Sequence, residues 1–439
     1  MGRTRDGHVL AMIPRRRGLD ATLALARRGY LFVTDTCDRL GADAFHTRLL
    51  GRRVICARGY SAAQAFYAAG RFTRRSAMPV SAAHLLQDAG SVQMLDGAPH
   101  HERKDLFVRA VPQGDAGAVL DPFREHWTHA AQRWSGRPRI ALLDELSEVL
   151  TRTATQWAGV ELPERDVAAR SRQLSLMITG AGSVGPRNWW ARWSRRRCER
   201  WAAHLVRAAR EDDSSCPAGS PLALIASHRD GDGRLLPEPV AAVELLNILR
   251  PLVAVGRFIV FAAVAMVRHP EWRHAFRHGD ESDLVGFVQE VRRLYPFFPL
   301  IGGKVLEPFT WSGHEFAAGD WMVLDLYGTN HDPRLWPDPE EFRPQRFRGW
   351  KGDASSLIPQ GGGEVGTGHR CPGENVTIAL IAEAVRMLAR QMEFTVPPQD
   401  LSIDLRRMPA RPRDGFVMTV QRADASRAPG PDGSGRAVG

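Results

Sequence analysis

Lysine is nearly absent from this chain of 439 residues, because its 59 basic side chains include only Lys104, Lys304 and Lys351. Arginine supplies the other 56 and brings the formal net charge to +10. A surplus of this size would suit a nucleic acid or an anionic membrane as partner. The arginines are spread along the whole chain instead of forming a basic tail, so no nucleic-acid partner is expected.

Cysteine is also scarce and shows no pairing pattern. The five cysteines are far apart, and no two of them have the Cys-x-x-Cys spacing: Cys37, Cys56, Cys198, Cys216 and Cys371. This distribution excludes a disulfide framework and a zinc ribbon. A reducing compartment, the cytoplasm, is therefore expected.

Long hydrophobic runs are missing as well. The longest, residues 258–267, has ten residues and is too short to span a bilayer, so it predicts a buried helix and no transmembrane anchor. The first 30 residues are interrupted by arginine and lack the apolar core of a signal peptide.

Apolar residues are plentiful, at 44% of the chain, which rules out a disordered protein. Their periodicity predicts a mainly α chain with small β-sheets, an α+β class. The predicted strands include Leu31–Val33 and Val54–Cys56, and the long predicted helices cover about 239–268, 281–295 and 374–391.

A glycine-rich loop carries the first chemical signal. The stretch Gly366-Thr-Gly-His-Arg-Cys-Pro-Gly-Glu374 places Cys371 directly before a predicted helix. Glycines permit the tight turns that aim a side chain at a flat cofactor, and Pro372 suits the first turn of a helix. A thiolate here would be stabilised by the positive helix end and could ligate haem iron. A buried structural cysteine is the alternative.

The second signal is Glu290-Val-Arg-Arg293 on a predicted helix, followed downstream by Phe342-Arg-Pro-Gln-Arg-Phe347. Glu and Arg three apart share a helix face and can pair, although such a pair alone is common and weak. In this order before a glycine-rich cysteine loop, the motifs resemble the cytochrome P-450 superfamily. The resemblance favours a single large haem-thiolate cytochrome P-450 domain over residues 1–422, with a disordered tail at 423–439.

The resemblance implies haem b, iron protoporphyrin IX, as the cofactor and Cys371 as its thiolate ligand. His100 and Lys104, four apart on one helix face, would meet the haem propionates; a solvated pair is the alternative. The resemblance assigns the remaining positions as follows: cofactor binding to Gly366, Gly368, Arg370 and Gly373, and a supporting network to Glu290, Arg293 and Arg346. The segment Gln360-Gly-Gly-Gly363 departs from the family, because the usual phenylalanine is missing and the loop is enlarged.

The third signal is an arginine followed by a proline in the long central helix. Ordinary members of the superfamily carry an acid–alcohol pair there, whereas this chain has Arg250-Pro251 in an apolar stretch. The proline should break the helical hydrogen-bond ladder and bend the helix. A buried arginine without an anionic partner is costly, and a bidentate carboxylate ligand would relieve that cost. The alternative is a solvated stripe formed by Arg250 and Arg257.

The Arg-Pro pair resembles the fatty-acid peroxygenase branch, bacterial enzymes that use hydrogen peroxide directly and need no reductase. The resemblance implies hydroxylation of long-chain fatty acids at the α or β carbon, with minor decarboxylation possible. Arg250 and Pro251 would be catalytic, with the substrate carboxylate on Arg250 assisting acid–base chemistry. Gln93 matches a position near the haem where glutamine favours hydroxylation; an exposed loop amide is the alternative.

The resemblance places Phe297 and Leu300 in the wall of the substrate pocket. The alternative is that both are ordinary apolar core residues. Ala181 is smaller than the residue that related sequences carry beside the substrate. Two other functions stay open: a conventional monooxygenase fed by redox partners, which the missing acid–alcohol pair disfavours, and a non-catalytic haem-thiolate binding protein.

Overall fold

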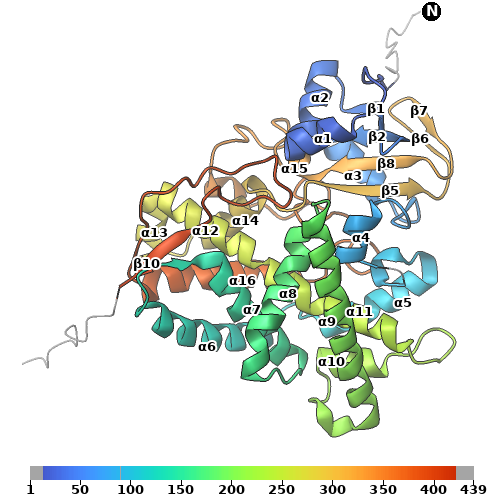
Figure 1. Cartoon of the computed structure of the whole chain (residues 1–439). Helices are drawn as coiled ribbons and strands as arrows, with labels where there is room; N and C mark the ends of the chain where they lie inside the picture. Colours follow the sequence, from blue (N-terminus) through green and yellow to red (C-terminus); the bar gives the residue numbers. More distant parts are fainter. Residues whose placement is uncertain (1–12, 89, 422–439) are drawn as a thin grey trace, which may run out of the picture.

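The structure, a computed structural model, describes residues 13–88 and 90–421. Helices make up most of it and small sheets the rest, which confirms the predicted fold class (Figure 1). The tail predicted at 423–439 lies outside the described residues.

The α-helices have the following bounds: α1 Thr22–Arg28, α2 Phe32–Leu40, α3 Tyr60–Tyr67, α4 Val80–Leu86, α5 Gly97–Ala110, α6 Gly117–Trp134, α7 Leu142–Ala158, α8 Glu164–Gly180, α9 Pro186–Glu211, α10 Pro221–Ser227, α11 Glu238–Ala254, α12 Gly256–Arg268, α13 Pro270–Arg277, α14 Leu284–Leu294, α15 Leu326–Asn330 and α16 Glu374–Arg386. The strands have these bounds: β1 Ala44–Leu49, β2 Arg52–Ala57, β3 Phe72–Thr73, β4 Ile140–Ala141, β5 Leu300–Val305, β6 Phe309–Trp311, β7 His314–Phe316, β8 Trp321–Asp325, β9 Phe394–Thr395 and β10 Val417–Val420.

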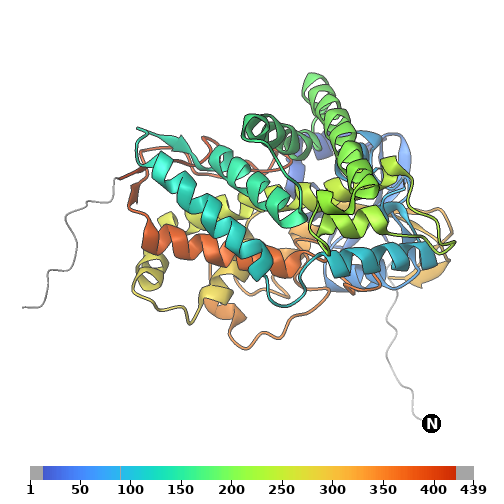
Figure 2. The same ribbon diagram turned by 90° about the horizontal axis from the view of Figure 1, so that it is seen from below.

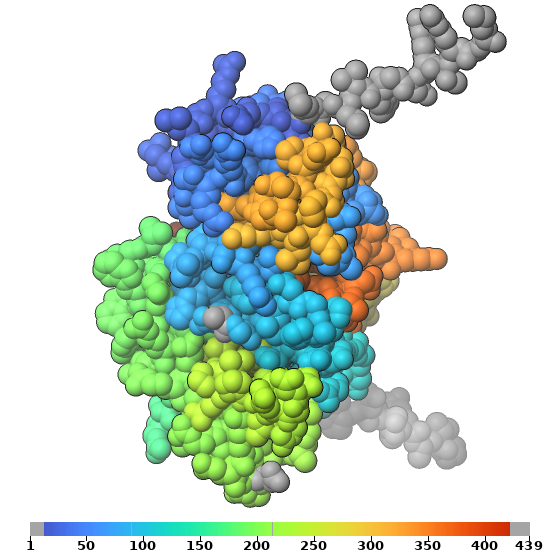
Figure 3. Space-filling view, turned by 90° about the vertical axis from the view of Figure 1, so that its right-hand side faces the viewer, coloured from blue at the N-terminus to red at the C-terminus, as the bar shows by residue number. Residues whose placement is uncertain are grey.

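The main sheet has five strands in the order β1-β2-β8-β5-β3 and joins the N-terminal region to residues beyond 300. Strands β2 and β8 pair in parallel, with Cys56 opposite Val323, and the other neighbours are antiparallel. Figure 3 shows blue N-terminal residues and orange residues from beyond about position 300 side by side at one end of the molecule. A three-stranded sheet, β4-β10-β9, lies near the C-terminal end of the described chain.

The large hydrophobic core lies among the helices and not in the sheet. It continues through α6, α7, α11, α12, α14 and α16, and its fully buried side chains include Trp127, Trp134, Leu249, Phe261 and Phe287. Figure 2 shows α6 and α7 covering α16 and α12, with α8 and α9 at the upper edge. The helix α11 therefore runs through the interior, where a charged side chain is far from bulk water.

Residues 258–267 form a buried helix, as the sequence predicts, within α12. The combined stretch Glu238–Arg268 is apolar and long enough to cross a membrane, but 89% of its most apolar part is buried inside the protein. This stretch is core.

One local prediction is wrong. The segment Leu31–Val33 is helical and not a strand: Leu31 ends a short 3-10 helix, and α2 begins at Phe32. The reason is that Phe32, Val33, Thr36 and Cys37 recur with helical spacing and are all buried on one face. The helix predicted over about 239–268 is interrupted once, at Val255: α11 continues past Pro251 to Ala254, and α12 begins at Gly256.

Gly286 on α14 faces the segment Pro344–Phe347, and a Cβ placed there would lie 2.6 Å from the Pro344 carbonyl oxygen. We expect Gly286→Ala to lower the free energy of unfolding by about 1–3 kcal/mol, because overpacking outweighs the gain in helix propensity of about 1 kcal/mol. Chemical denaturation measures this change. Gly114→Ala, which meets no atom within 4 Å, is the control, and equal effects of the two substitutions would contradict the expectation.

Candidate functional site

Cys371 lies in an irregular loop that ends where α16 begins, at Glu374. Its side chain is half-buried, and the Gln360 amide donates to Sγ across 3.9 Å. Burial raises the pKa of the Cys371 thiol, and the Gly373 N–H only partly offsets this rise. The start of α16 therefore favours the thiolate through this N–H, while burial opposes it.

Ion pairs connect the cysteine loop to α14 and α16. Arg292 pairs with Glu374, and Arg370 pairs with the other oxygen of the same carboxylate at 2.7 Å. Burial acts to raise the pKa of Glu374, but the two guanidinium groups hold it below its usual value. Gln360 completes the contact by donating to the Thr377 hydroxyl at 3.1 Å. No sequence pattern singled out Arg292 or Gln360 for this task.

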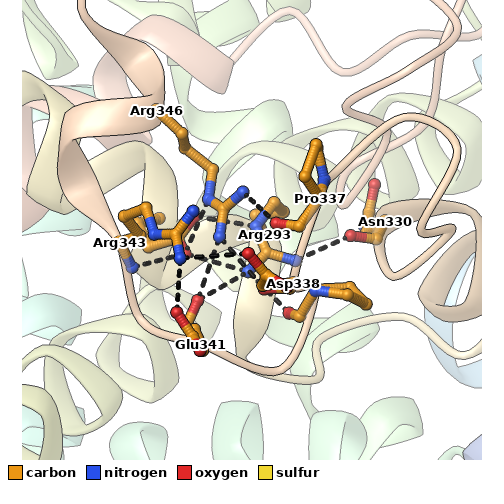
Figure 4. A network of polar contacts seen from close by, with 9 residues as sticks. Arg293, Asn330, Pro337, Asp338, Glu341, Arg343 and Arg346 are labelled. Atoms are coloured by element: carbon orange, nitrogen blue, oxygen red, sulfur yellow. Dashed lines mark hydrogen bonds and ion pairs between the residues drawn. The ribbon is translucent and has the colours of Figure 1, made fainter.

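Glu290, Arg293 and Arg346 come together in one buried network (Figure 4). Arg293 makes a bidentate pair with Glu290 at 2.7 and 2.9 Å, and neither side chain is exposed. Arg346 Nε and the Arg343 backbone N–H donate to the same carboxylate. Arg293 also donates to the Asn330 carbonyl at 3.0 Å, so the network joins α14 to the irregular segment between α15 and the cysteine loop.

Arg250 is 5% exposed, and its guanidinium meets the C-terminal end of α4. It donates to the Leu86 carbonyl at 2.6 Å, to the Leu85 carbonyl at 3.2 Å and to Asn247 Oδ1 at 3.0 Å. Among the described residues, no carboxylate lies within ion-pair distance. Burial therefore lowers the pKa of Arg250 to about 9, and the charge of Arg195 acts in the same direction.

The solvated-stripe alternative is wrong, because Arg257 is also buried, at 6% exposure, and donates to the Ala410 carbonyl at 3.1 Å. Pro251, by contrast, is exposed between buried neighbours. Its face of α11 also carries Ala254, which is half-buried. This face of an interior helix is therefore not filled by side chains of the described residues.

Gln93 is connected to Arg250 through Asn247, which contacts both side chains. Asn247 donates to Gln93 Oε1 at 3.3 Å and to Glu244 at 3.0 Å. Glu244 is fully buried, accepts from the Val92 backbone N–H and pairs with Arg103, both at 2.8 Å. The only nearby acid of α11 is thus already committed to Arg103 and does not neutralise Arg250. The sequence prediction missed Asn247 and Arg103. Asn247, three residues before Arg250 on the same helix face, was a usable signal, whereas nothing in the sequence linked Arg103 to Glu244.

His100 and Lys104 are both buried and belong to a larger group, the basic cluster, formed by Arg74, His100, Lys104 and His369. The rings of His100 and His369 are 4.3 Å apart, and Lys104 donates to the Arg370 carbonyl at 2.6 Å. Burial and mutual repulsion lower the pKa of His100 to about 4, while burial lowers that of Lys104 to about 8. No carboxylate of the described residues forms an ion pair with the cluster.

The other predicted positions are less closely grouped. Gly366 is exposed and meets nothing within 4 Å, whereas a Cβ on Gly368 would lie 2.6 Å from the Glu364 carbonyl oxygen. Phe297 stacks on Phe258 of α12 with ring centroids 4.3 Å apart, and Ala181 is buried in the same core. Leu300 packs instead against the cluster around Trp321 beside the main sheet.

These features fit a haem. Cys371 Sγ is available as a ligand, the Pro251 face of α11 is open, and the basic cluster lacks the anions that two propionates would supply. The protein atoms of the described residues neither cover the Pro251 face nor balance the charge of the basic cluster. Together they define a haem-thiolate protein.

Comparisons with known proteins point to the same class of protein. The cytochrome P450 family model matches residues 284–419. A mutant of cytochrome P450SP alpha (CYP152B1) is 42% identical, with a TM-score of 0.89 and coverage of 92% of this chain and 98% of that one. Cytochrome P450EX alpha (CYP152N1) with myristic acid is 38% identical, covering 93% and 98%, with a TM-score of 0.89. A variant of cytochrome P450 OleT in complex with arachidonic acid is 34% identical, covering 94% and 99%, with a TM-score of 0.90.

Alignments to curated relatives are shorter. Cytochrome P450 4A7 of Oryctolagus cuniculus is 26% identical over 36% of this chain, and the alignment spans about a third of that relative, 34% of its length. The chain belongs to the cytochrome P450 family, within its CYP152 branch of fatty-acid peroxygenases.

Glu290→Gln keeps the shape of the side chain but removes its charge, leaving Arg293 and Arg346 buried without a counter-ion. We expect the free energy of unfolding to fall by about 3–5 kcal/mol, together with loss of haem occupancy on heating. Thermal unfolding followed by haem absorbance measures both. Glu238→Gln, which breaks the exposed pair with Arg207, should cost less than about 1 kcal/mol, and a comparable loss there would refute a special role for Glu290.

Proposed function

We propose that this protein is a haem-thiolate enzyme that hydroxylates long-chain fatty acids at the α or β carbon with hydrogen peroxide as oxidant. The observation that carries the proposal is the uncompensated charge of Arg250 beside the open Pro251 face of α11. Haem b would supply the oxidative chemistry when bound, with Cys371 as the ligand of its iron. The basic cluster and Arg370 would hold the cofactor.

Arg250 would bind the substrate carboxylate. Its Nη atoms already contact the Leu85 and Leu86 carbonyls and Asn247, so the guanidinium is held in one orientation before substrate arrives. Pre-ordering lowers the entropy cost of binding. A carboxylate would also supply the missing counter-charge and raise the pKa of Arg250 back towards its ordinary value.

The bound carboxylate would also move the proton that peroxide activation requires. Residues Glu244 to Val255 hold no acid–alcohol pair, and Glu244 is engaged by Arg103 and the Val92 N–H. A substrate carboxylate on Arg250 would therefore be the nearest free acid–base group at the open face. This role makes activity depend on an acidic substrate and dispenses with an obligate reductase.

Anchoring the headgroup also determines which carbon reacts. With its carboxylate held on Arg250, a fatty acid presents its α and β carbons nearest to the cofactor, while the tail extends into apolar surroundings. The complexes of related structures with myristic and arachidonic acid support a long-chain acid as substrate. Phe297 and Ala181 are the proposed apolar walls, and Gln93 would favour hydroxylation over decarboxylation.

Product analysis tests the function. Purified holoenzyme incubated with a series of long-chain fatty acids and hydrogen peroxide should yield 2- or 3-hydroxy acids, with no turnover of the methyl esters, which cannot pair with Arg250. Cys371→Ala is the negative control. Turnover with a ferredoxin, its reductase and oxygen, but not with peroxide, would establish a conventional monooxygenase instead. No turnover of any acid would leave a haem-thiolate binding protein.

Arg250→Ala should lower kcat/KM for fatty acids by about 100-fold or more, because a charge-assisted contact of about 3 kcal/mol is lost. Arg257→Ala is the matched control, since it removes another buried arginine from the neighbouring helix α12 without touching the Arg250 contacts. Rates are compared per mole of bound haem. Equal losses in the two variants, or full activity of Arg250→Ala, would refute the carboxylate site.

A further inference from the structure

The first turns of α9 expose an unusual amount of aromatic surface. Trp189, Trp190 and Trp193 are 66%, 62% and 48% exposed, and Val184, in the turn before the helix, is 85% exposed. Large apolar side chains at this exposure are costly unless something covers them. Because these four side chains lie within ten residues of one another, they form a continuous patch.

The patch is built into the helix. Trp189 and Trp193 lie four apart and share a face, while Trp190 packs edge-to-face on Trp193 with ring centroids 5.7 Å apart. The guanidinium of Arg197 lies 4.8 Å from the centre of the Trp193 ring. Helix α9 has eight arginines against two glutamates, and one of these, Glu199, is taken by the buried Arg195. The outer face of α9 is therefore aromatic and cationic.

Neighbouring segments extend the same surface. Asn188 donates to the Ser81 carbonyl at 3.4 Å, which places the first turn of α4, with its 74% exposed Val80, beside the first turn of α9. On the other side, a Cβ on Gly182 would lie 2.3 Å from the Met408 carbonyl oxygen, so the turn before α9 rests on the segment 404–413. Figures 1 and 2 show α9 at the periphery of the helical layer.

The segment 404–413 adds arginines that lack acidic partners. Arg407 and Arg411 form no ion pair with any described residue, and Arg411 Nε is buried without a hydrogen-bond partner. Burial and the charges of Arg411 and Arg187 lower the pKa of Arg407, so the three groups lie within electrostatic range of one another. A cavity of about 150 Å³ lies between Arg407, Arg411 and their neighbours, and its one acid, Asp404, pairs with Arg406 at 3.1 Å.

We propose that these residues form a docking surface for an anionic phospholipid membrane. The docking surface consists of Val184, Trp189, Trp190 and Trp193, which would enter the interface, and of Arg187, Arg407 and Arg411, which would bind lipid phosphates. Tryptophan prefers the boundary between headgroups and acyl chains, and arginine pairs bidentately with phosphate. The attraction of cationic side chains to an acidic leaflet adds to the binding.

A membrane suits these features better than a nucleic acid. Nucleic-acid stacking uses aromatic rings set in a basic groove, whereas these tryptophans project from the outer face of a helix together with the aliphatic Val184. Docking would bring the protein to the phase in which long-chain fatty acids concentrate. Membrane binding is independent of the proposed chemistry, since it is measured without turnover.

Co-sedimentation of the full-length holoprotein with vesicles tests the proposal. Vesicles of equal parts phosphatidylcholine and phosphatidylglycerol should retain the protein, and pure phosphatidylcholine vesicles should retain much less. The triple variant Trp189→Ser, Trp190→Ser, Trp193→Ser should weaken binding by roughly tenfold or more, because interfacial burial of the rings is lost. Arg187→Glu should weaken binding to anionic vesicles by roughly fivefold or more, with the difference disappearing at high salt.

Matched controls are available on other surfaces. Val285→Ser, at an exposed apolar position of α14, and Arg234→Glu, at an exposed arginine before α11, should leave vesicle binding unchanged. Unchanged haem absorbance and unfolding midpoints show that the variants are folded. The proposal is overturned if the wild type does not bind anionic vesicles, or if the control variants lose binding equally. Salt-sensitive binding to duplex DNA that needs the same arginines, without binding to vesicles, would identify a nucleic-acid surface instead.

Discussion

The fold around the cysteine loop depends on the buried carboxylate of Glu290. Two guanidinium groups and a backbone N–H converge on it, so α14 is joined to a chain segment 53 residues downstream. Arg292, one position before Arg293, reaches Glu374 at the start of α16. A single helix thus fixes both sides of the loop that presents Cys371. Because unpaired buried charges are so costly, this arrangement admits little variation in the position of the sulfur atom.

Buried charges that lack a partner carry the functional information. Arg250 is satisfied by carbonyl oxygens and an amide, which meet its hydrogen-bonding needs but not its charge. The basic cluster, on the side where the haem would bind, likewise has no ion pair with a carboxylate of the described residues. Balanced charges build the scaffold, and unbalanced ones mark where anions are expected: the fatty-acid carboxylate at Arg250 and the propionates at the cluster. At the surface, unpaired arginines beside exposed tryptophans lead to the membrane proposal by the same reasoning.

Much of the site could be anticipated from local spacing. The three-residue separation of Glu290 and Arg293 determines that they share a helix face, and the apolar run at 258–267 determines a buried helix. Prediction failed where a pattern was short: three apolar residues at 31–33 fit a strand as well as the start of the amphipathic helix α2.

By itself, the sequence determined the class of protein, since the order of the motifs and the helical periodicity are local properties of the chain. The tertiary structure decided which charges are balanced. Whether Arg250 meets a carboxylate depends on α4 and α5, about 150 residues earlier, where Arg103 takes Glu244 and the Leu85 and Leu86 carbonyls face the guanidinium. Charge compensation is set by distance in space, and only the folded chain brings these groups together.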